Sequence, residues 1–403
     1  MKRIVLALAA VAGIGATGVG GVVERRYRGQ PGNALDLAEH DWRADYLAPG
    51  HLRVGGHVTA HNPQAAREVM IADVRPTVRL LSDSSVAELS VAVTVLSNEP
   101  KDYPTRPDQH WTAYVVKPKK YGEDRRIEFR ADVTGPVELL DQAYAAWFDI
   151  AVDTYGFEGL RTIHYLQVVP LRFPDDDPET TPPQWRASGR CDVLAIRTHL
   201  LSPLDDPAAV IKRYVAPYAQ PGDLVTIGES PVAVMQRRMR DPRDIRLGWF
   251  ARRLCQFMSG EGSLGTATGM QALMDQVGVA RVVAALAGGK MAKLAGQDGW
   301  FYRLTGEQSR LIDDVTGTLP PYDRHIVLGP LDADAVCADI ETATGLLAAV
   351  VDANDLGRVD LVGASSGVDH DLVKEALRPN PAGNGFETTP IVLIRPRAAP
   401  RRP

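Results

Sequence analysis

The chain has 403 residues, a length typical of about two or three domains rather than one. Hydrophobic residues make up 45% of the chain and charged residues 24%, which excludes wholesale disorder, a collagen-like fibre and a polytopic membrane bundle. The formal net charge of -5 gives no general attraction to nucleic acid, so we expect no nucleic-acid partner.

Residues 1–30 predict a membrane anchor. Ile4 to Val23 is an uncharged stretch of 20 residues with basic residues on both sides, and this length can span a bilayer as one helix. A cleaved secretory signal is the rival interpretation, but the apolar run is long for a signal and lacks a clean small-x-small cleavage site before a polar start. We therefore favour a single transmembrane helix.

Residues 31–172 predict a β-rich, sandwich-like domain. Short runs such as Leu89 to Val95 alternate between apolar and polar residues, as strands with one buried face do. Turn residues between the runs favour an antiparallel arrangement. The aromatic segment around Trp111 resembles a stacking site, but sandwich cores commonly bury one tryptophan, so we predict a structural role. Val137 to Ile150 carries apolar residues at helical spacing and predicts a packed helix.

Residues 173–187 predict an exposed linker, because they are acidic and proline-rich. After the linker, helices alternate with buried strands over residues 188–396, which favours an α+β or α/β domain. The clearest elements are strands at Leu224 to Ile227 and Leu346 to Val351 and helices at Thr268 to Leu286 and Asp332 to Ala343. Residues 397–403 predict a disordered basic tail. We assign the whole chain to the α+β class.

The densest polar cluster follows the predicted strand that ends at Val351. Its side chains include Asp352, Asn354, Asp355 and Arg358. Carboxylates that emerge from a buried strand end can form a divalent-cation site of hard oxygen ligands, with Asp313 and Asp314 on the opposite wall. An Asx-rich turn whose side chains cap the backbone is an equally good interpretation.

Five segments stand in a consistent order and spacing over roughly half of the chain. They are Thr198 to Leu201, Pro221 to Ile227, Ile312-Asp313, Leu328 to Arg358, and Pro390 to Arg395. Together they resemble the ligase family that adds glutamate to the precursor of the deazaflavin coenzyme F-420. The family has a lysine after its glycine-aspartate strand, where residues 228–231 have none. This departure, together with Asn354-Asp355 in place of aspartate-threonine, indicates a divergent paralogue.

The resemblance implies an amide ligase driven by hydrolysis of GTP or ATP. A small-molecule acid would become an acyl phosphate, which the amino group of an amino acid then opens, with Mg²⁺ or Mn²⁺ as cofactor. The resemblance also implies a homodimer, and because the reaction needs a nucleotide we expect the carboxy-terminal domain to be cytoplasmic. The residues implied are Thr198, His199, Leu200 and Asp223 for the nucleotide, Asp313, Asp355, Asp352 and Asn354 for the metal, and Arg358 as the catalytic cation.

Two other classes of function stay open. In the first, the protein is a membrane-tethered binding module that has lost catalysis and works through its sandwich. In the second, Gly363 to Gly367 is the nucleophile elbow of a serine hydrolase with Ser365 as nucleophile. The only later histidine, His370, follows too closely for the usual order of acid and histidine.

Overall fold

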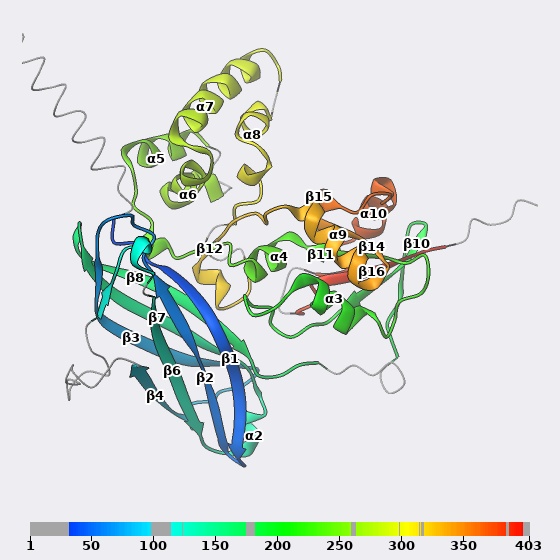
Figure 1. Ribbon diagram of the computed structural model, residues 1–403. Coiled ribbons are helices and arrows are strands. Elements are labelled where there is room, and N and C mark those ends of the chain that lie inside the picture. Colours follow the sequence, from blue (N-terminus) through cyan, green and yellow to red (C-terminus); the bar gives the residue numbers. More distant parts are fainter. Residues whose placement is uncertain are drawn as a thin grey trace, which may run out of the picture.

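The structure is a computed structural model in which a β-sandwich, an α+β domain and a projecting helical lobe follow one another along the chain (Figure 1). It describes residues 32–97, 114–122, 124–174, 182–258, 263–297, 299–313, 315, 318–383 and 387–397. The predicted membrane helix, Trp111, Asp314 and the basic tail from residue 398 onward lie outside these residues.

Two four-stranded antiparallel sheets form the sandwich. One has the order β1 (Asp36–Ala48), β2 (His51–His61), β6 (Arg125–Thr134), β4 (Ser90–Ser97), and the other has the order β5 (Tyr114–Val116), β3 (Val69–Ser82), β7 (Ala143–Gly156), β8 (Gly159–Pro170). Trp42 on β1 joins their inner faces, because its ring centroid lies 5.9 Å from that of Phe129 on β6 and 4.8 Å from that of Phe148 on β7. The predicted β-rich domain is confirmed.

The helix predicted for Val137 to Ile150 is wrong. Only α2 (Val137–Leu140) is helical, and β7 follows it. The run of four residues from Ala145 to Phe148 is buried throughout, because one face of β7 packs in the sandwich while Ala145 and Trp147 pack against the next domain. A strand buried on both faces loses its apolar-polar alternation, and its apolar run then resembles a helix.

A six-stranded sheet organises the α+β domain. Its order is β15 (Val359–Ala364), β14 (Leu347–Ala353), β11 (Leu224–Gly228), β16 (Ile391–Pro396), β10 (Cys191–Ile196), β9 (Arg186–Ser188). The pair β11 and β14 is parallel, whereas the other neighbours are antiparallel. Helices α3 (Pro207–Val215), α4 (Glu229–Met235) and α9 (Ala333–Thr344) cover one face, and α10 (His370–Leu377) covers the other.

The helical lobe consists of α5 (Trp249–Leu254), α6 (Ala267–Val277), α7 (Val279–Leu294) and α8 (Trp300–Thr305). It has its own core, which includes Met270, Leu273 and Phe301. The single helix predicted for this region is two helices because Gly278, with φ of 89°, turns the chain. In the described part of the chain no helix alone passes the length and hydropathy test for a membrane span; α6 and α7 pass it only jointly, with a bend of 112°.

The segment that follows α4 joins the sandwich to the α+β domain. Arg237 donates hydrogen bonds to Glu39 Oε1 on β1 at 3.1 Å, to the Leu166 carbonyl on β8 at 3.0 Å, and to Gln167 Oε1 at 2.7 Å. The Arg237 and Glu39 side chains are 26% and 22% exposed. This contact is therefore a largely buried ion pair between domains.

We call residues 237–246 the seam, because further ion pairs join the same two domains along them. These pairs are Arg243 with Asp149, Asp244 with His164, and Arg246 with Glu158. Within the seam, β12 (Met239–Arg240) pairs with β13 (Ile326–Val327). Asp313 extends this small sheet by exchanging two backbone hydrogen bonds with Val327. The seam thus connects the sandwich to the backbone that carries Asp313.

Arg237→Ala should lower the free energy of unfolding by about 2 to 3 kcal/mol, because the Glu39 carboxylate and the Gln167 amide both lose a partner. Urea unfolding followed by tryptophan fluorescence measures this loss. The matched control is Arg43→Ala, which removes the exposed pair with Asp45 and should leave the free energy of unfolding nearly unchanged. Equal losses for the two variants would contradict the importance of the seam.

Candidate functional site

A cavity of 660 Å³ opens where β11 and β14 end, and its size is within the range of small-ligand pockets. Gly228 on β11 lies opposite Val351 on β14 in the parallel pair, so both carboxyl ends reach the same edge of the sheet. The next residues, Glu229 at the start of α4 and Asp352 near the end of β14, therefore lie close together. Both line the cavity.

Asp313 completes a cluster of three carboxyl groups at this cavity. Burial raises the pKa of Glu229 well above its usual range, and the charges of Asp313 and Asp352 raise it further. Burial also raises the pKa of Asp313, where the Ser230 hydrogen bond opposes the rise and Asp352 adds to it. The pKa of Asp352 is raised by burial and lowered again by Arg358. The carboxyl groups thus repel one another in a poorly solvated place.

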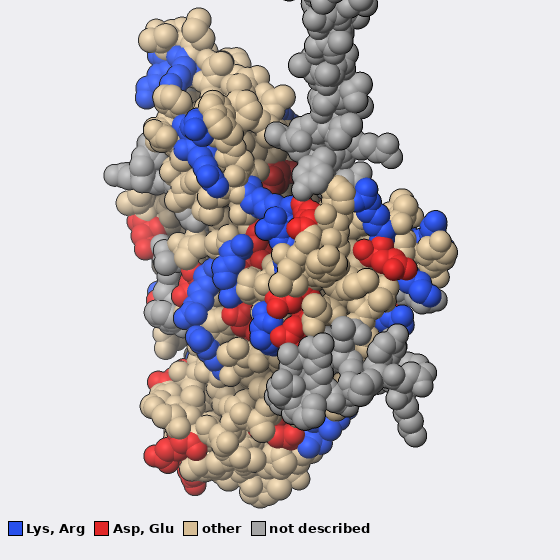
Figure 2. All heavy atoms as spheres, turned by 90° about the vertical axis from the view of Figure 1, so that its left-hand side faces the viewer, with Lys and Arg blue, Asp and Glu red and all other residues tan. Residues whose placement is uncertain are grey.

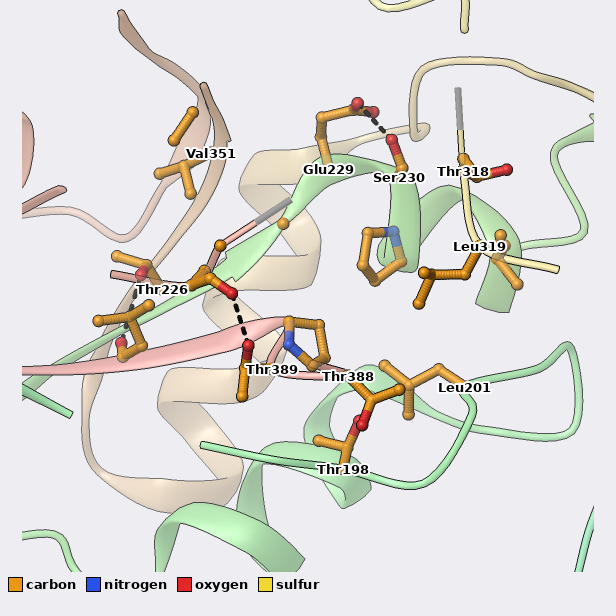
Figure 3. Close-up of a pocket in the computed structure, with 18 of the residues that line it drawn as sticks. Thr198, Leu201, Thr226, Glu229, Ser230, Thr318, Leu319, Val351, Thr388 and Thr389 are labelled. Carbon is orange, nitrogen blue, oxygen red and sulfur yellow. Dashed lines mark hydrogen bonds between the residues drawn. The ribbon is translucent and has the colours of Figure 1, made fainter. Parts of the chain in front are cut away.

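The Ser230 hydroxyl links two members of the cluster. Its oxygen lies 2.6 Å from Glu229 Oε1 and 2.8 Å from Asp313 Oδ2, and Figure 3 shows the contact with Glu229 at the start of α4. A hydroxyl has one hydrogen to donate, so both contacts are hydrogen bonds only when one carboxyl group holds a proton. The pKa is raised more strongly for Glu229 than for Asp313, so we expect Glu229 to hold this proton. Ser230 then donates to Asp313.

Within the described ranges, no group of three or more His, Cys, Asp or Glu side chains is arranged so that it could hold a metal ion. However, Glu229 Oε2 and Thr318 Oγ1 are buried in the cavity wall without a hydrogen-bond partner in the described structure. Such oxygens are unfavourable unless a ligand or water reaches them. Carboxylate and hydroxyl oxygens are the ligands that Mg²⁺ and Mn²⁺ prefer.

The residues predicted for the nucleotide divide into two groups. Thr198, His199 and Leu200 line the cavity, and Figure 3 shows Thr198 across the cavity from Glu229. Both ring nitrogens of His199 are already engaged, since Nδ1 lies 2.7 Å from Tyr214 Oη and Nε2 lies 2.9 Å from Asp205 Oδ1.

Asp223, in contrast, does not line the cavity. It is buried and pairs with Arg395 through oxygen-nitrogen distances of 2.9 and 2.7 Å. This pair ties the start of β11 to β16, which is a structural role.

The predicted metal ligands divide in the same way. Asp313 and Asp352 lie in the carboxyl cluster, but Asn354 and Asp355 do not line the cavity. Asn354 Oδ1 accepts hydrogen bonds from the Leu356 and Arg358 amides, which is the Asx turn that the sequence left open. Asp355 is exposed and accepts a hydrogen bond from Asn380 Nδ2 at 2.7 Å. We therefore remove both from the candidate metal set.

Arg358, the predicted catalytic cation, also lies outside the cavity lining. It donates a hydrogen bond from Nε to Asp360 Oδ2 at 2.9 Å. Its side chain is 55% exposed. It influences the cavity only through its charge, which lowers the pKa of Asp352.

The proposed hydrolase nucleophile is not placed for catalysis. Ser365 is 5% exposed, accepts a hydrogen bond from the Ala348 amide and donates one to the Cys337 carbonyl. His370 begins α10 and is exposed. Ser365 therefore holds β14 against α9 through these hydrogen bonds, and the segment Gly363 to Gly367 does not present a nucleophile.

Glu229 is the site residue that the sequence interpretation missed. The signal was present, because Glu229 follows the predicted strand at Leu224 to Ile227 as Asp352 follows the strand ending at Val351. What the sequence does not show is that these two strands are parallel neighbours in register. The resemblance directs this segment to a lysine, which residues 228–231 lack, and not to the glutamate that stands there.

Glu229→Gln should change how stability depends on pH when no metal is present. A raised carboxyl pKa means that the folded state keeps a proton that the unfolded chain has lost, so stability falls as pH rises above the ordinary carboxyl range. Without Glu229 the fall between about pH 5 and pH 8 should be shallower. Urea unfolding in EDTA across this range measures it.

The matched control for this experiment is Glu375→Gln. The Arg190 hydrogen bond lowers the pKa of Glu375, so its stabilisation is present above the ordinary glutamate pKa and is lost only as pH falls. This variant should leave the decline toward pH 8 unchanged. Wild-type and Glu229→Gln curves that run parallel would contradict the proton assignment.

Comparisons with solved structures give only remote likenesses. The GAE domain of yeast GGA1 has a TM-score of 0.21 at 8% identity, covering 35% of this chain and 96% of that one. A protein from Archaeoglobus fulgidus has 0.20 at 8% identity over 34% and 96%. The collagen-binding domain of a Staphylococcus aureus adhesin has 0.17 at 11% identity over 33% and 99%. TM-scores this low do not show a shared fold.

Among curated proteins, none matches this chain. A family model does match residues 36–173, and it is described as the N-terminal Ig-like domain of F420-0:gamma-glutamyl ligase. This range contains every strand from β1 to β8. The likeness of residues 191–396 to the catalytic part of such ligases stays a prediction. Through its Ig-like sandwich, the chain is related at a coarse level to the F420-0:gamma-glutamyl ligase family.

Proposed function

We propose that this protein is an amide ligase that depends on a divalent metal and on GTP or ATP, and that it joins a small-molecule acid to an amino acid. The observation that carries the proposal is the cluster of Glu229, Asp313 and Asp352 at one cavity. The relation of the sandwich to F420-0:gamma-glutamyl ligase supports the reaction class.

The charge of the cavity favours a metal-dependent reaction. Neither lysine nor arginine is among the described residues that line the cavity. A polyphosphate that enters without a cation would therefore meet the acidic side chains and no basic one. Repulsion of this kind is relieved when cations lie between phosphate and carboxylate. We therefore expect Glu229, Asp313 and Asp352 to bind the metal first, and the nucleotide to bind only to the metal-loaded protein.

The proposed reaction has two displacement steps. A substrate carboxylate oxygen attacks the terminal phosphorus, and the bond to the nucleoside diphosphate breaks. The amino nitrogen then attacks the acyl carbon, the amide bond forms, inorganic phosphate leaves and the nitrogen loses a proton. Divalent cations would neutralise the phosphate oxygens in both steps.

The chain's own residues would orient the reactants around these steps. Thr198 and Thr388, on the wall opposite Glu229 (Figure 3), offer hydroxyl groups to the nucleotide or the acid. Ser230 holds the Asp313 carboxylate in place. Proximity and orientation of this kind supply a large share of the rate acceleration in two-substrate enzymes.

Thermal unfolding of the full chain tests the proposal. Mn²⁺ or Mg²⁺ at about 100 times its dissociation constant should stabilise the protein by about 2.7 kcal/mol. GTP or ATP should add stabilisation only when metal is present. Glu229→Gln and Asp352→Asn should each abolish the metal effect, because each removes a charged ligand.

Asp355→Asn is the matched control, because it changes a nearby aspartate that lies outside the cavity lining. It should keep the full metal effect. Loss of the effect in Asp355→Asn and its retention in Glu229→Gln would return the metal to the site expected from the sequence. If no metal or nucleotide stabilises the wild-type chain, the ligase proposal fails and the non-catalytic binding module is favoured.

A further inference from the structure

The helical lobe exposes large apolar side chains at its surface. Trp249 is 62% exposed, Phe257 58%, Met291 69% and Leu294 86%. Figure 1 shows the lobe projecting away from both the sandwich and the six-stranded sheet. Apolar patches of this kind on a soluble protein generally mark a surface that binds a partner.

One cation–π contact links α7 to the segment that follows α5. Lys290 Nζ on α7 lies 3.7 Å from the ring centroid of Phe257, which follows α5 in η3 (Cys255–Phe257). Along α7, Leu294 is four residues after Lys290 and three after Met291, so the three share one side of the helix. We call the surface formed by the exposed residues of 249–257 and 290–294 the lobe face.

The lobe face carries positive charge that the rest of the described protein does not neutralise. Residues 249–310 contain seven basic residues, Arg252, Arg253, Arg281, Lys290, Lys293, Arg303 and Arg310, and four acidic ones, Glu261, Asp275, Asp298 and Glu307. Within α5 to α8 the acidic residue is Asp275, and it pairs with Arg240 at 2.6 Å. Arg252, Arg253, Lys290 and Lys293 form no ion pair with a described residue.

The distribution of charged side chains differs between the helical lobe and the middle of the molecule. Figure 2 shows the lobe as mostly uncharged surface interrupted by lysine and arginine, whereas acidic and basic groups are interspersed below it on the same view. An apolar surface bordered by one sign of charge is complementary to a partner that is apolar inside and negative at its surface.

We propose that the lobe face binds the surface of a bilayer that contains anionic phospholipids. Aromatic and aliphatic side chains would enter the region between headgroups and acyl chains, while Arg252, Arg253, Lys290 and Lys293 attract the lipid phosphates. The uncharged stretch Ile4 to Val23 independently predicts that this chain is held at a membrane.

A second copy of the chain fits the lobe face less well. In a symmetric dimer the same patch faces itself, so the basic residues of one copy would lie against those of the other. Like charges brought together in this way oppose association. A phosphate-rich surface turns the same charges into attraction.

Hydrogen exchange of the full chain, resolved by peptide, tests the proposal. The probes are vesicles of phosphatidylglycerol mixed with phosphatidylcholine, compared with vesicles of phosphatidylcholine alone. Amides of residues 249–258 and 286–297 should exchange about tenfold more slowly on the anionic vesicles than on the neutral ones. An amino-terminal anchor would bind both kinds of vesicle, so the difference between them reports the lobe face.

Two matched double variants separate the lobe face from general electrostatic attraction. Arg252→Glu with Arg253→Glu should remove the protection by anionic vesicles, whereas Lys119→Glu with Lys120→Glu in the sandwich should keep it. All four residues are exposed, so both proteins should unfold at the wild-type temperature. Met291→Ser with Leu294→Ser should weaken the protection by removing the apolar contribution.

Three results would overturn the proposal. They are equal exchange on anionic and neutral vesicles, equal loss of protection in the two charge-reversal variants, and protection that grows with protein concentration in the absence of lipid. The last result would assign the lobe face to self-association.

Discussion

The contact of Arg237 with the sandwich is the constraint on which the candidate site depends. Arg237 lies two residues after the end of the short helix α4, whose first residues are Glu229 and Ser230. Its φ of 56° is uncommon for a residue with a side chain. Hydrogen bonds to β1 and β8, and the Tyr165 ring 4.6 Å from its guanidinium, hold it there. One end of α4 is thus fixed by the sandwich while the other end carries the acidic site.

Apolar packing supports the same relation between the domains. Leu200, Val234 and Tyr322 line the cavity on the α+β side and pack against Trp147 and Leu166 of the sandwich. The sandwich therefore supports the residues that line the cavity from behind, in addition to forming a separate core.

The carboxyl cluster is a costly arrangement for the protein without a ligand. Three acidic groups lie close together, and burial together with the neighbouring charges raises the pKa of Glu229 well above its usual range. Buried unpaired charge lowers stability, and proteins commonly accept such costs where function needs them. The seam and the apolar contacts around it compensate for this cost by fixing the backbone on both sides of the cluster.

Apolar–polar alternation in the sequence correctly predicted a strand that has one buried face, and it failed where a strand is buried on both faces. Leu89 to Val95 alternates clearly and forms part of the strand region around β4, whereas β7 is buried on both faces and imitated a helix. Asp352 was recognisable as a carboxylate at the end of a buried strand, and Asp313 as part of an acidic pair with Asp314. The pairing of Asp223 with Arg395 spans 172 residues, and neither partner's neighbourhood reveals it. Contacts of this range are set by topology, which composition and spacing do not encode.

The parallel pair β11 and β14 limits where this domain can build a site. In an antiparallel sheet, consecutive strands finish at opposite edges, so functional groups that follow them point apart. Among the described strands of this sheet, one pair of neighbours, β11 and β14, is parallel. Glu229 and Asp352 lie at the carboxyl ends of this pair, which we call the junction. A change in the ligand that such a domain binds would therefore arise in the loops that surround this junction, because a similar site at any other edge of the sheet would first require a new crossover connection.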